Sequence, residues 1–446
     1  MRYITEPSKE IPVIGEYDVV VCGGGPAGIC AGLAAARQGL KTLLIEQFNC
    51  LGGIATAGLH QKMAVFCGSG GYPEIAGGLA GEIRRRSLEE GGAQYLQEQR
   101  IYSDTALFVD IEGYKFMLDR MAKEAGLELL YYSQFQDVLA SNRKIEGVIV
   151  TGKSGRLAVL AKSFIDCTGD ADVAYRAGCP VQIGRPEDGG MQPVTLMYRV
   201  GGIEAAKIWK YQEDQDPVLE EFCKKAVEKG LMGPWQTKLM GFWWNENRPD
   251  YLNINFSHMH YDGTSVFDLT KAAIKGRQQV QEAVRAMRAL IPGFEKSYLI
   301  DTASYIGIRE TRRIKGEFVL SIDDLKSQKI FEDSIGLGAA FIDIHNVEGP
   351  GMDKKSGYVF PEGGYYSIPY RTLVPQGVEN LLVAGRCHSA THEAAGSTRW
   401  MTQCMMMGEA AGMAAKLSIE SQCGGMKAVD IKKLQERLKS NGAILS

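Results

Sequence analysis

The chain has no long hydrophobic run, no large excess of charge of one sign and no closely spaced pair of cysteines. No stretch approaches the roughly 18 consecutive apolar residues that a membrane-spanning helix needs. Residues 1–16 show no apolar core of the signal-peptide kind. We therefore expect no membrane partner and a cytoplasmic location. The net charge of −3 at pH 7 gives no basis for a nucleic-acid partner either.

The cysteines and histidines exclude two further kinds of site. The ten cysteines are scattered and lie mostly in apolar runs, as reduced core residues do, and none stands in a C-x-x-C or C-x-x-x-x-C pair. A redox-active disulfide is therefore not expected. His388 and His392 are four residues apart and could share a helix face, but the six histidines show no zinc-type spacing, so we predict no metal site.

What the chain does contain is a βαβ pattern near its N-terminus. Residues 17–22 predict a buried parallel strand, residues 26–38 an alanine-rich helix, and residues 41–46 a second strand. A chain of 446 residues is too long for one simple core, so two interleaved domains are expected.

Further elements follow from the same periodicities. They are a helix at 110–125, a strand at 128–132, hairpin strands at 137–140 and 145–151, a strand at 158–166, an amphipathic helix at 268–290, a strand at 380–384 and a helix at 398–417. Because a strand followed by a helix returns near the C-terminus, the first domain is expected to be discontinuous.

A glycine-rich turn joins the first predicted strand to the helix. In Gly23-x-Gly25-x-x-Gly28, the first glycine allows the sharp turn, the second leaves room for a phosphate, and the third lets the helix approach the sheet. Glu46 lies 18 positions after Gly28 (46 minus 28), where a carboxylate accepts hydrogen bonds from a ribose hydroxyl. The pattern predicts a dinucleotide at the helix N-terminus. Its spacing leaves NAD and FAD both open.

Longer segments resemble a known family. The chain is similar to bacterial FAD-dependent oxidoreductases of the glutathione-reductase structural superfamily, and distantly to the flavoproteins of succinate dehydrogenase and fumarate reductase. The segments that carry the resemblance are VVVCGGGPAGICAGLAAARQGLKTLLIEQ at 19–47, LGGIAT at 51–56, FIDCTGDADVAYRAG at 164–178, GIRETRRIKGEFVLSIDD at 307–324 and NLLVAGRCHSATHEAAGSTRWMTQCMMMGEAAG at 380–412.

The resemblance implies FAD as the cofactor and an α/β fold. This fold has a Rossmann-like FAD-binding domain, made of a parallel sheet plus a β-meander, and an interleaved α+β substrate domain. The expected FAD-binding domain comprises residues 1–66, 104–180, 298–320 and 360–446, and the expected substrate or cap domain comprises residues 67–103, 181–297 and 321–359.

The resemblance also implies which residues hold FAD. The helix beginning near Gly396 is expected to point its N-terminus at the N1/O2 edge of the flavin, where reduction places negative charge. The implied cofactor-binding residues are Gly23, Gly25, Pro26, Ala27, Gly28, Glu46, Gln47, Gly52, Gly53, Thr56, Val138, Thr168, Gly169, Asp170, Gly385, Arg386, Gly396, Ser397 and Thr398.

Histidines and arginines near the expected flavin are the catalytic candidates. Oxidation of a substrate by a flavin needs a base that takes a proton from the substrate while the hydride moves to N5. We predict His392 or His388 for that role. Arg309 and Arg399 suit a substrate carboxylate, because a guanidinium offers two parallel donors. An alternative is that such arginines pair with neighbouring carboxylates or with the phosphates of FAD.

Two special arrangements are not expected. His60 and Cys50 lie in the region where relatives of succinate dehydrogenase attach their flavin, but AGLHQK at 57–62 does not match that attachment sequence, so noncovalent FAD is predicted. Residues 336–341 lack the third glycine of a second nucleotide turn, and the strand-like residues 341–345 follow instead of a helix. A dedicated NAD(P)H domain is therefore not predicted.

Three hypotheses follow. The leading one is an FAD-dependent oxidoreductase that transfers a hydride between flavin N5 and a small, anionic organic substrate. The second is a flavoprotein of tRNA or cofactor modification, which the acidic balance disfavours. The third is a flavin-binding protein without catalysis of its own. A homodimer is one expected assembly.

Overall fold

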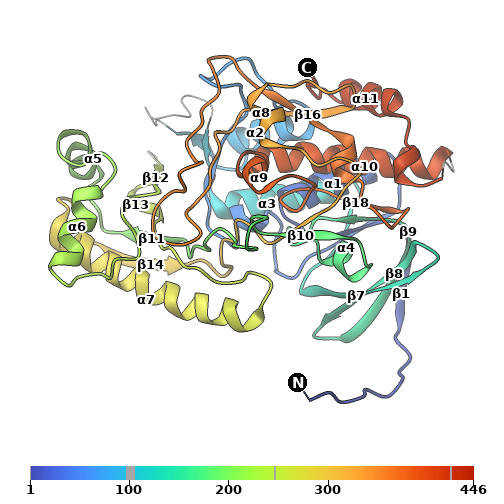
Figure 1. Cartoon of the computed structure of the whole chain (residues 1–446), viewed down its shortest axis with the longest axis horizontal. Helices are drawn as coiled ribbons and strands as arrows, with labels where there is room; N and C mark the ends of the chain where they lie inside the picture. Colours follow the sequence, from blue (N-terminus) through green and yellow to red (C-terminus); the bar gives the residue numbers. More distant parts are fainter. Residues whose placement is uncertain (1, 97–105, 246–247, 422–423) are drawn as a thin grey trace.

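A seven-stranded sheet with a parallel centre forms the middle of the larger lobe (Figure 1). The computed structural model describes residues 2–96, 106–245, 248–421 and 424–446. The strand order is β6-β2-β1-β9-β8-β7, and β18 pairs with the last residues of β9, on the edge opposite β1. The parallel strands are β6 (Glu128–Leu130), β2 (Thr42–Ile45), β1 (Val13–Cys22), β9 (Gly155–Asp166) and β18 (Leu381–Val383).

The same sheet continues into a β-meander. Strands β7 (Ser133–Ser141) and β8 (Lys144–Gly152) are antiparallel to each other, and β8 is antiparallel to the first half of β9. The turn between them places Asn142 and Arg143 at φ angles of 48° and 64°, as a tight two-residue hairpin requires. The predicted fold class, a parallel sheet plus a β-meander with further antiparallel sheets, is confirmed.

Two helices distant in sequence pack against one face of this sheet. Helix α1 (Pro26–Arg37) lies beside α10 (Met401–Ser421), as Figure 1 shows. The approach is close, because a Cβ on Gly408 would lie 2.0 Å from the carbonyl oxygen of Ala27. Helices α2 (Gly78–Glu89) and α3 (Ile111–Glu124) complete this layer. No helix in the described part of the chain is both long and apolar enough to cross a membrane.

The smaller lobe contains a four-stranded antiparallel sheet with helices on it (Figure 1). Its strand order is β12-β13-β11-β14, and these strands are β12 (Gly241–Asn245), β13 (Arg248–Asn255), β11 (Tyr198–Gly201) and β14 (Tyr298–Thr302). Its helices are α5 (Ala205–Asp214), α6 (Glu220–Glu228) and α7 (Val266–Leu290). The proposed division into domains assigns β14 to the other lobe, although β14 pairs with β11. The proposed boundary between residues 103 and 104 lies outside the described residues.

The remaining elements are mostly short. They are η1 (Gly53–Ala55), β3 (Lys62–Met63), β4 (Gln94–Tyr95), β5 (Leu107–Phe108), α4 (Asp172–Arg176), β10 (Val181–Ile183), β15 (Arg312–Ile314), α8 (Ile322–Lys326), β16 (Ser334–Gly338), β17 (Tyr366–Pro369), η2 (Tyr370–Leu373), α9 (His392–Thr398), η3 (Met426–Ala428) and α11 (Ile431–Ser440). The nine cysteines in the described ranges are buried and unbridged.

Two sequence predictions about these elements differ from the structure. The predicted helix at 398–417 is present as α10 but begins three residues later, because Thr398 ends the separate helix α9, which the Thr391 side chain caps, and the chain breaks before Met401. At this break the indole N–H of Trp400 donates to the Gly396 carbonyl oxygen at 3.2 Å. Residues 341–345, expected to be strand-like, form no strand.

Candidate functional site

One cavity of about 980 Å³ extends from the glycine turn of the larger lobe to the antiparallel sheet of the smaller lobe. Its walls include Gly25 and Glu46 at one end, and Trp243 and Asn255 from the strands β12 and β13 at the other. A cavity that both lobes line is the usual place for a cofactor and a substrate to meet.

The glycine turn is shaped so that a ligand can touch its backbone. A Cβ on Gly25 would have no protein atom within 4 Å, so it would project into the open cavity. A Cβ on Gly28 would lie 1.7 Å from the carbonyl oxygen of Gly23, so the first turn of α1 can form here only with glycine. The N-terminus of α1 therefore presents bare backbone and the positive end of its dipole to the cavity.

Glu46 is fixed beside this turn at the end of β2. Its carboxylate accepts hydrogen bonds from the backbone N–H of Gly24 at 2.7 Å and of Phe48 at 2.8 Å. The side chain is buried, and burial raises the pKa of Glu46 above its ordinary value. Gln47 also lines the cavity, whereas Val138 does not. From β7 the lining residues are instead Ser133, Gln134 and Phe135, which the sequence reasoning missed.

An ion pair lies in the cavity wall next to the glycine turn. Arg386 Nη2 donates to Asp170 Oδ1 at 2.8 Å, and both residues line the cavity. Asp170 follows Thr168, whose hydroxyl donates to the buried Asp166 carboxylate at 2.7 Å. The segment that contains the T-G-D sequence and the segment after β18 thus meet at this wall, and the ion pair joins them.

The structure brings most of the predicted cofactor-binding residues together. Those that line the cavity are Gly23, Gly25, Pro26, Ala27, Glu46, Gln47, Gly53, Thr168, Gly169, Asp170, Gly385 and Arg386. Those outside its lining are Gly28, Gly52, Thr56, Val138, Gly396, Ser397 and Thr398. The last three lie in α9 and not at a helix start, and the residues that line the cavity where α10 begins are Arg399, Trp400 and Met401.

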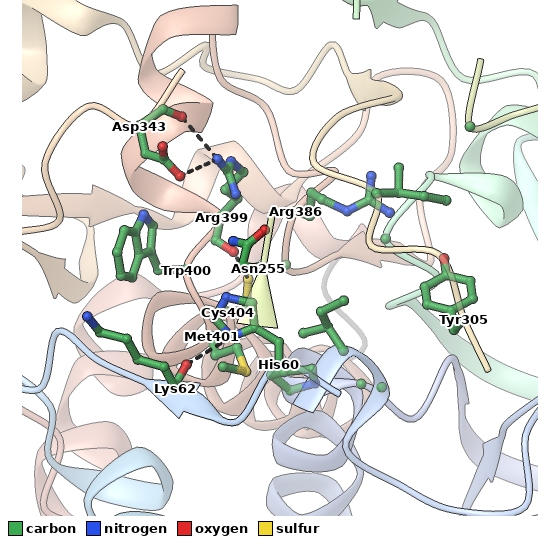
Figure 2. Close-up of a pocket in the computed structure, with 18 of the residues that line it drawn as sticks. His60, Lys62, Asn255, Tyr305, Asp343, Arg386, Arg399, Trp400, Met401 and Cys404 are labelled. Carbon is green, nitrogen blue, oxygen red and sulfur yellow. Dashed lines mark hydrogen bonds and ion pairs between the residues drawn. The ribbon is translucent and has the colours of Figure 1, made fainter. Parts of the chain in front are cut away.

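The far part of the cavity is rich in aromatic side chains, and we call it the aromatic chamber. It is lined by His60, Lys62, Trp209, Phe242, Trp243, Trp244, Asn255, Phe341, Arg399 and Trp400. Figure 2 shows Lys62 and Trp400 on one side of His60, and Arg386 and Tyr305 on the other. In this view His60 lies between these two groups of side chains, and all five residues line the cavity.

His60 is held as a neutral base. Its Nδ1 lies 3.0 Å from the backbone carbonyl oxygen of Lys62. Because a carbonyl oxygen only accepts, Nδ1 carries the proton, and the lone pair is on Nε2. Burial lowers the pKa of His60 to about 4, so the ring is neutral at pH 7. Its ring centroid lies 4.9 Å from that of Trp243.

A charged group of residues lies at the other side of the chamber. Arg399 Nη2 donates to Asp343 Oδ2 at 2.7 Å, and Asp343 Oδ1 lies 3.5 Å from His345 Nε2 (Figure 2 shows the first pair). All three residues line the cavity. Burial, with Arg309 and Arg399 nearby, lowers the pKa of His345 well below its ordinary value. Asp343 thus fixes the orientation of the Arg399 guanidinium.

The other catalytic candidates lie outside the cavity lining. His388 is fully buried, its Nε2 lies 2.8 Å from Thr398 Oγ1, and burial lowers its pKa to about 3. His392 Nδ1 lies 2.8 Å from a carboxylate oxygen of Glu310, and both are buried. These two histidines bind different partners, and only His392 belongs to α9, so they do not share a helix face.

Arg309 does not line the cavity, and its guanidinium binds other groups of the protein. Its Nη1 donates to the Pro193 carbonyl oxygen at 2.8 Å and to Thr195 Oγ1 at 2.6 Å. Burial lowers the pKa of Arg309 to about 10. Of the four catalytic candidates, the structure therefore places only Arg399 in the cavity wall.

Comparison with known proteins identifies the family. The family model described as FAD dependent oxidoreductase matches residues 18–438. A solved structure of a geranylgeranyl bacteriochlorophyll reductase-like protein from Thermoplasma acidophilum is 14% identical, with 96% of this chain and 84% of that chain covered and a TM-score of 0.47. A triple mutant of the flavin-dependent brominase Bmp2 is 14% identical, with 95% and 84% covered and a TM-score of 0.48. The anhydrotetracycline hydroxylase OxyS from Streptomyces rimosus is 13% identical, with 92% and 63% covered and a TM-score of 0.42.

Proposed function

The chain belongs to the family of FAD dependent oxidoreductases, and we propose that it transfers a hydride between FAD and a small anionic organic molecule held in the aromatic chamber. The observation that carries this proposal is the single cavity that connects the bare glycine turn to His60. Within the family, kinship with the glutathione-reductase superfamily, and more distantly with the flavoproteins of succinate dehydrogenase and fumarate reductase, is part of the proposal.

The residues at the glycine turn fit FAD. The space that a Cβ on Gly25 would fill admits a pyrophosphate against the backbone, and Glu46 is placed to accept from a ribose hydroxyl. Arg386 supplies positive charge in the lining of the same cavity. When bound, FAD supplies the N5 atom that accepts or gives the hydride.

We assign the proton transfer to His60. The lone pair on Nε2 can take a proton from a hydroxyl, an amine or a carbon next to an activating group of the substrate. The hydrogen bond from Nδ1 to the Lys62 carbonyl oxygen orients the ring and stabilises the positive charge that the ring gains. Because the pKa of His60 is about 4, the ring is neutral above pH 5 and can accept a proton. As the pH falls towards 4, the ring becomes protonated and can no longer act as a base.

Arg399 and Lys62 support an anionic substrate. Asp343 binds Arg399 through Nη2, and Nη1 remains for a carboxylate of the substrate. Lys62 Nζ lies 5.8 Å from the centroid of the Trp243 ring, at the same chamber wall. Lys62 adds a second cation to the lining of the cavity.

Anaerobic reduction of the bound flavin tests this proposal. Protein loaded with FAD is mixed with a panel of hydroxy acids and amines, and the loss of flavin absorbance is followed. Enoates accept a hydride, so they are mixed with the chemically reduced protein, and the return of flavin absorbance is followed. The variant His60→Asn keeps a donor for the Lys62 carbonyl oxygen but has no base at the Nε2 position. We expect its flavin reduction to be about 100-fold slower or more at unchanged FAD content.

The exposed His260 provides the matched control. Its variant His260→Asn is expected to reduce the flavin at the wild-type rate, and the wild-type rate is expected to fall below pH 5. Reduction of His60→Asn at the rate of the wild type would exclude His60 as the base.

A further inference from the structure

The tryptophans of this protein are concentrated in one place. Four of the five, Trp209, Trp243, Trp244 and Trp400, line the cavity. The fifth, Trp235, lies outside the lining, packs edge-on against Phe256 at 5.1 Å, and donates its indole N–H to Glu282 at 2.7 Å. In the described structure the indole rings are therefore concentrated around the chamber and are not spread through the core.

The local structure of β12 brings two successive tryptophans to the cavity. In a regular strand, neighbouring side chains point to opposite faces of the sheet. The pairing of β12 with β13 shifts register between Trp243 and Asn245, so the irregularity falls at Trp244. Both Trp243 and Trp244 line the cavity. Gly241 and Phe242 line the cavity as well, so this whole stretch of β12, and not the irregularity alone, borders it.

Aromatic rings from other elements surround these two. The ring centroids of Trp209 and Trp244 lie 5.6 Å apart, and those of Phe341 and Trp400 lie 5.7 Å apart in an edge-to-face arrangement. Rings with this spacing offer both faces and edges to a further ring. A saturated, flexible molecule would gain only contact area here, whereas a flat aromatic one would also gain the stacking interaction.

Charged and hydrogen-bonding side chains lie beside the same rings. Lys62 Nζ lies over the Trp243 ring at 5.8 Å, and Arg399 reaches the cavity wall next to Trp400. Asn255 adds a nearly buried amide whose Oδ1 has no hydrogen-bond partner within the described part of the chain. The chamber thus combines flat apolar walls with two cations, Lys62 and Arg399.

From this pairing we propose that the substrate is a planar aromatic anion, such as an aromatic carboxylate, with its ring among the tryptophans and its acid group at Lys62 and Arg399. This inference rests on the proposed function, since it names the substrate class for the same cavity. The ring is held by stacking, and the acid group fixes its direction toward His60.

Calorimetric titration of the FAD-loaded protein with matched probes tests this inference. The probes are 2-naphthoate, its saturated counterpart decahydro-2-naphthoate, and the uncharged 2-naphthamide. We expect 2-naphthoate to bind at least fivefold more tightly than either of the others. Equal affinity for the saturated acid would overturn the aromatic part, equal affinity for the amide would overturn the anionic part, and no binding of 2-naphthoate would overturn both.

Variants separate the chamber from the rest of the protein. Trp243→Leu is expected to weaken 2-naphthoate at least fivefold and to leave decahydro-2-naphthoate within twofold. Lys62→Met is expected to weaken 2-naphthoate but not 2-naphthamide. Trp235→Phe is the matched control and should change none of these affinities. A Trp235→Phe effect as large as that of Trp243→Leu would contradict the placement of the ring.

The two proposals fail in different ways. If the protein retains FAD but does not discriminate between the probes, the substrate class is wrong and the proposed function stands. If the protein retains no FAD, the proposed function is wrong, and the same titrations on the FAD-free protein still decide the nature of the chamber.

Discussion

Replacement of Glu409 by glutamine is expected to stabilise the protein at pH 8 and to have little effect near pH 4.5. Glu409 lies on α10 with 1% of its surface exposed. Its carboxylate accepts from the backbone N–H of Leu79 at 2.9 Å and from the side chain of Asn441. These two donors do not offset the loss of water, and burial raises the pKa of Glu409 from 4.5 to about 7.

The sign and size of the effect follow from this pKa. The folded protein holds the proton of Glu409 more tightly than the unfolded chain does. The contribution of Glu409 to the free energy of unfolding is therefore most favourable below pH 4.5 and is lost as the pH rises through 7. A pKa difference of about 2.5 corresponds to about 3.4 kcal/mol at full ionisation. Glutamine is neutral at every pH, and the amide of Asn441 can rotate to offer it an acceptor. The variant Glu409→Gln should therefore avoid a penalty of about 3 kcal/mol at pH 8.

Thermal unfolding of the two proteins at several pH values measures this penalty. With an unfolding entropy of about 2.1 cal/mol/K per residue, 3 kcal/mol corresponds to a rise in Tm of about 3 °C for a chain of this length. Glu436→Gln, at an exposed position of α11, is the control and should follow the wild type. A Glu409→Gln protein that is less stable than the wild type at pH 8, or equally sensitive to pH, would refute the reasoning.

Further predictions concern the glycine turn and a buried ion pair. Gly25→Val is expected to keep the fold but to bind FAD at least tenfold more weakly, because the valine side chain enters the cavity. Gly28→Val is expected to prevent folding, because its Cβ would overlap the carbonyl oxygen of Gly23; soluble yield and FAD absorbance distinguish the two, and a Gly25→Val protein that retains FAD would contradict the site. Arg313→Met is expected to cost about 3–5 kcal/mol, because it leaves the buried Glu310 without its guanidinium partner, and an unchanged Tm would contradict this.

The cofactor half of the site was predictable because its signals are local. The glycine pattern, the β-branched strand before it and Glu46 after it lie within 30 residues, and each has a steric or hydrogen-bonding reason that the sequence shows directly. The structure places Gly25 and Glu46 in one cavity wall. Arg386, which the resemblance over residues 380–412 implies as a cofactor contact, lines the same cavity, and the helix expected to start near Gly396 starts at Met401.

The aromatic chamber was not predictable, because it is assembled from segments far apart in the chain. His60, Trp243, Phe341 and Arg399 come from four separate regions, and nothing in the local sequence of any of them points to the others. His60 was considered only as a possible point of flavin attachment. The neighbouring tryptophans at 243 and 244 are visible in the sequence, but the position of their strand along the cavity wall is not. The state of assembly stays a prediction.

The amount of flavin that the protein retains tests the central claim most directly. The purified protein is incubated with FAD, desalted, and its flavin absorbance is compared with its protein concentration. We expect one FAD per chain, released into the supernatant when the protein is precipitated with trichloroacetic acid. A protein that remains colourless after this incubation would contradict the assignment of the glycine turn and, with it, the proposed function.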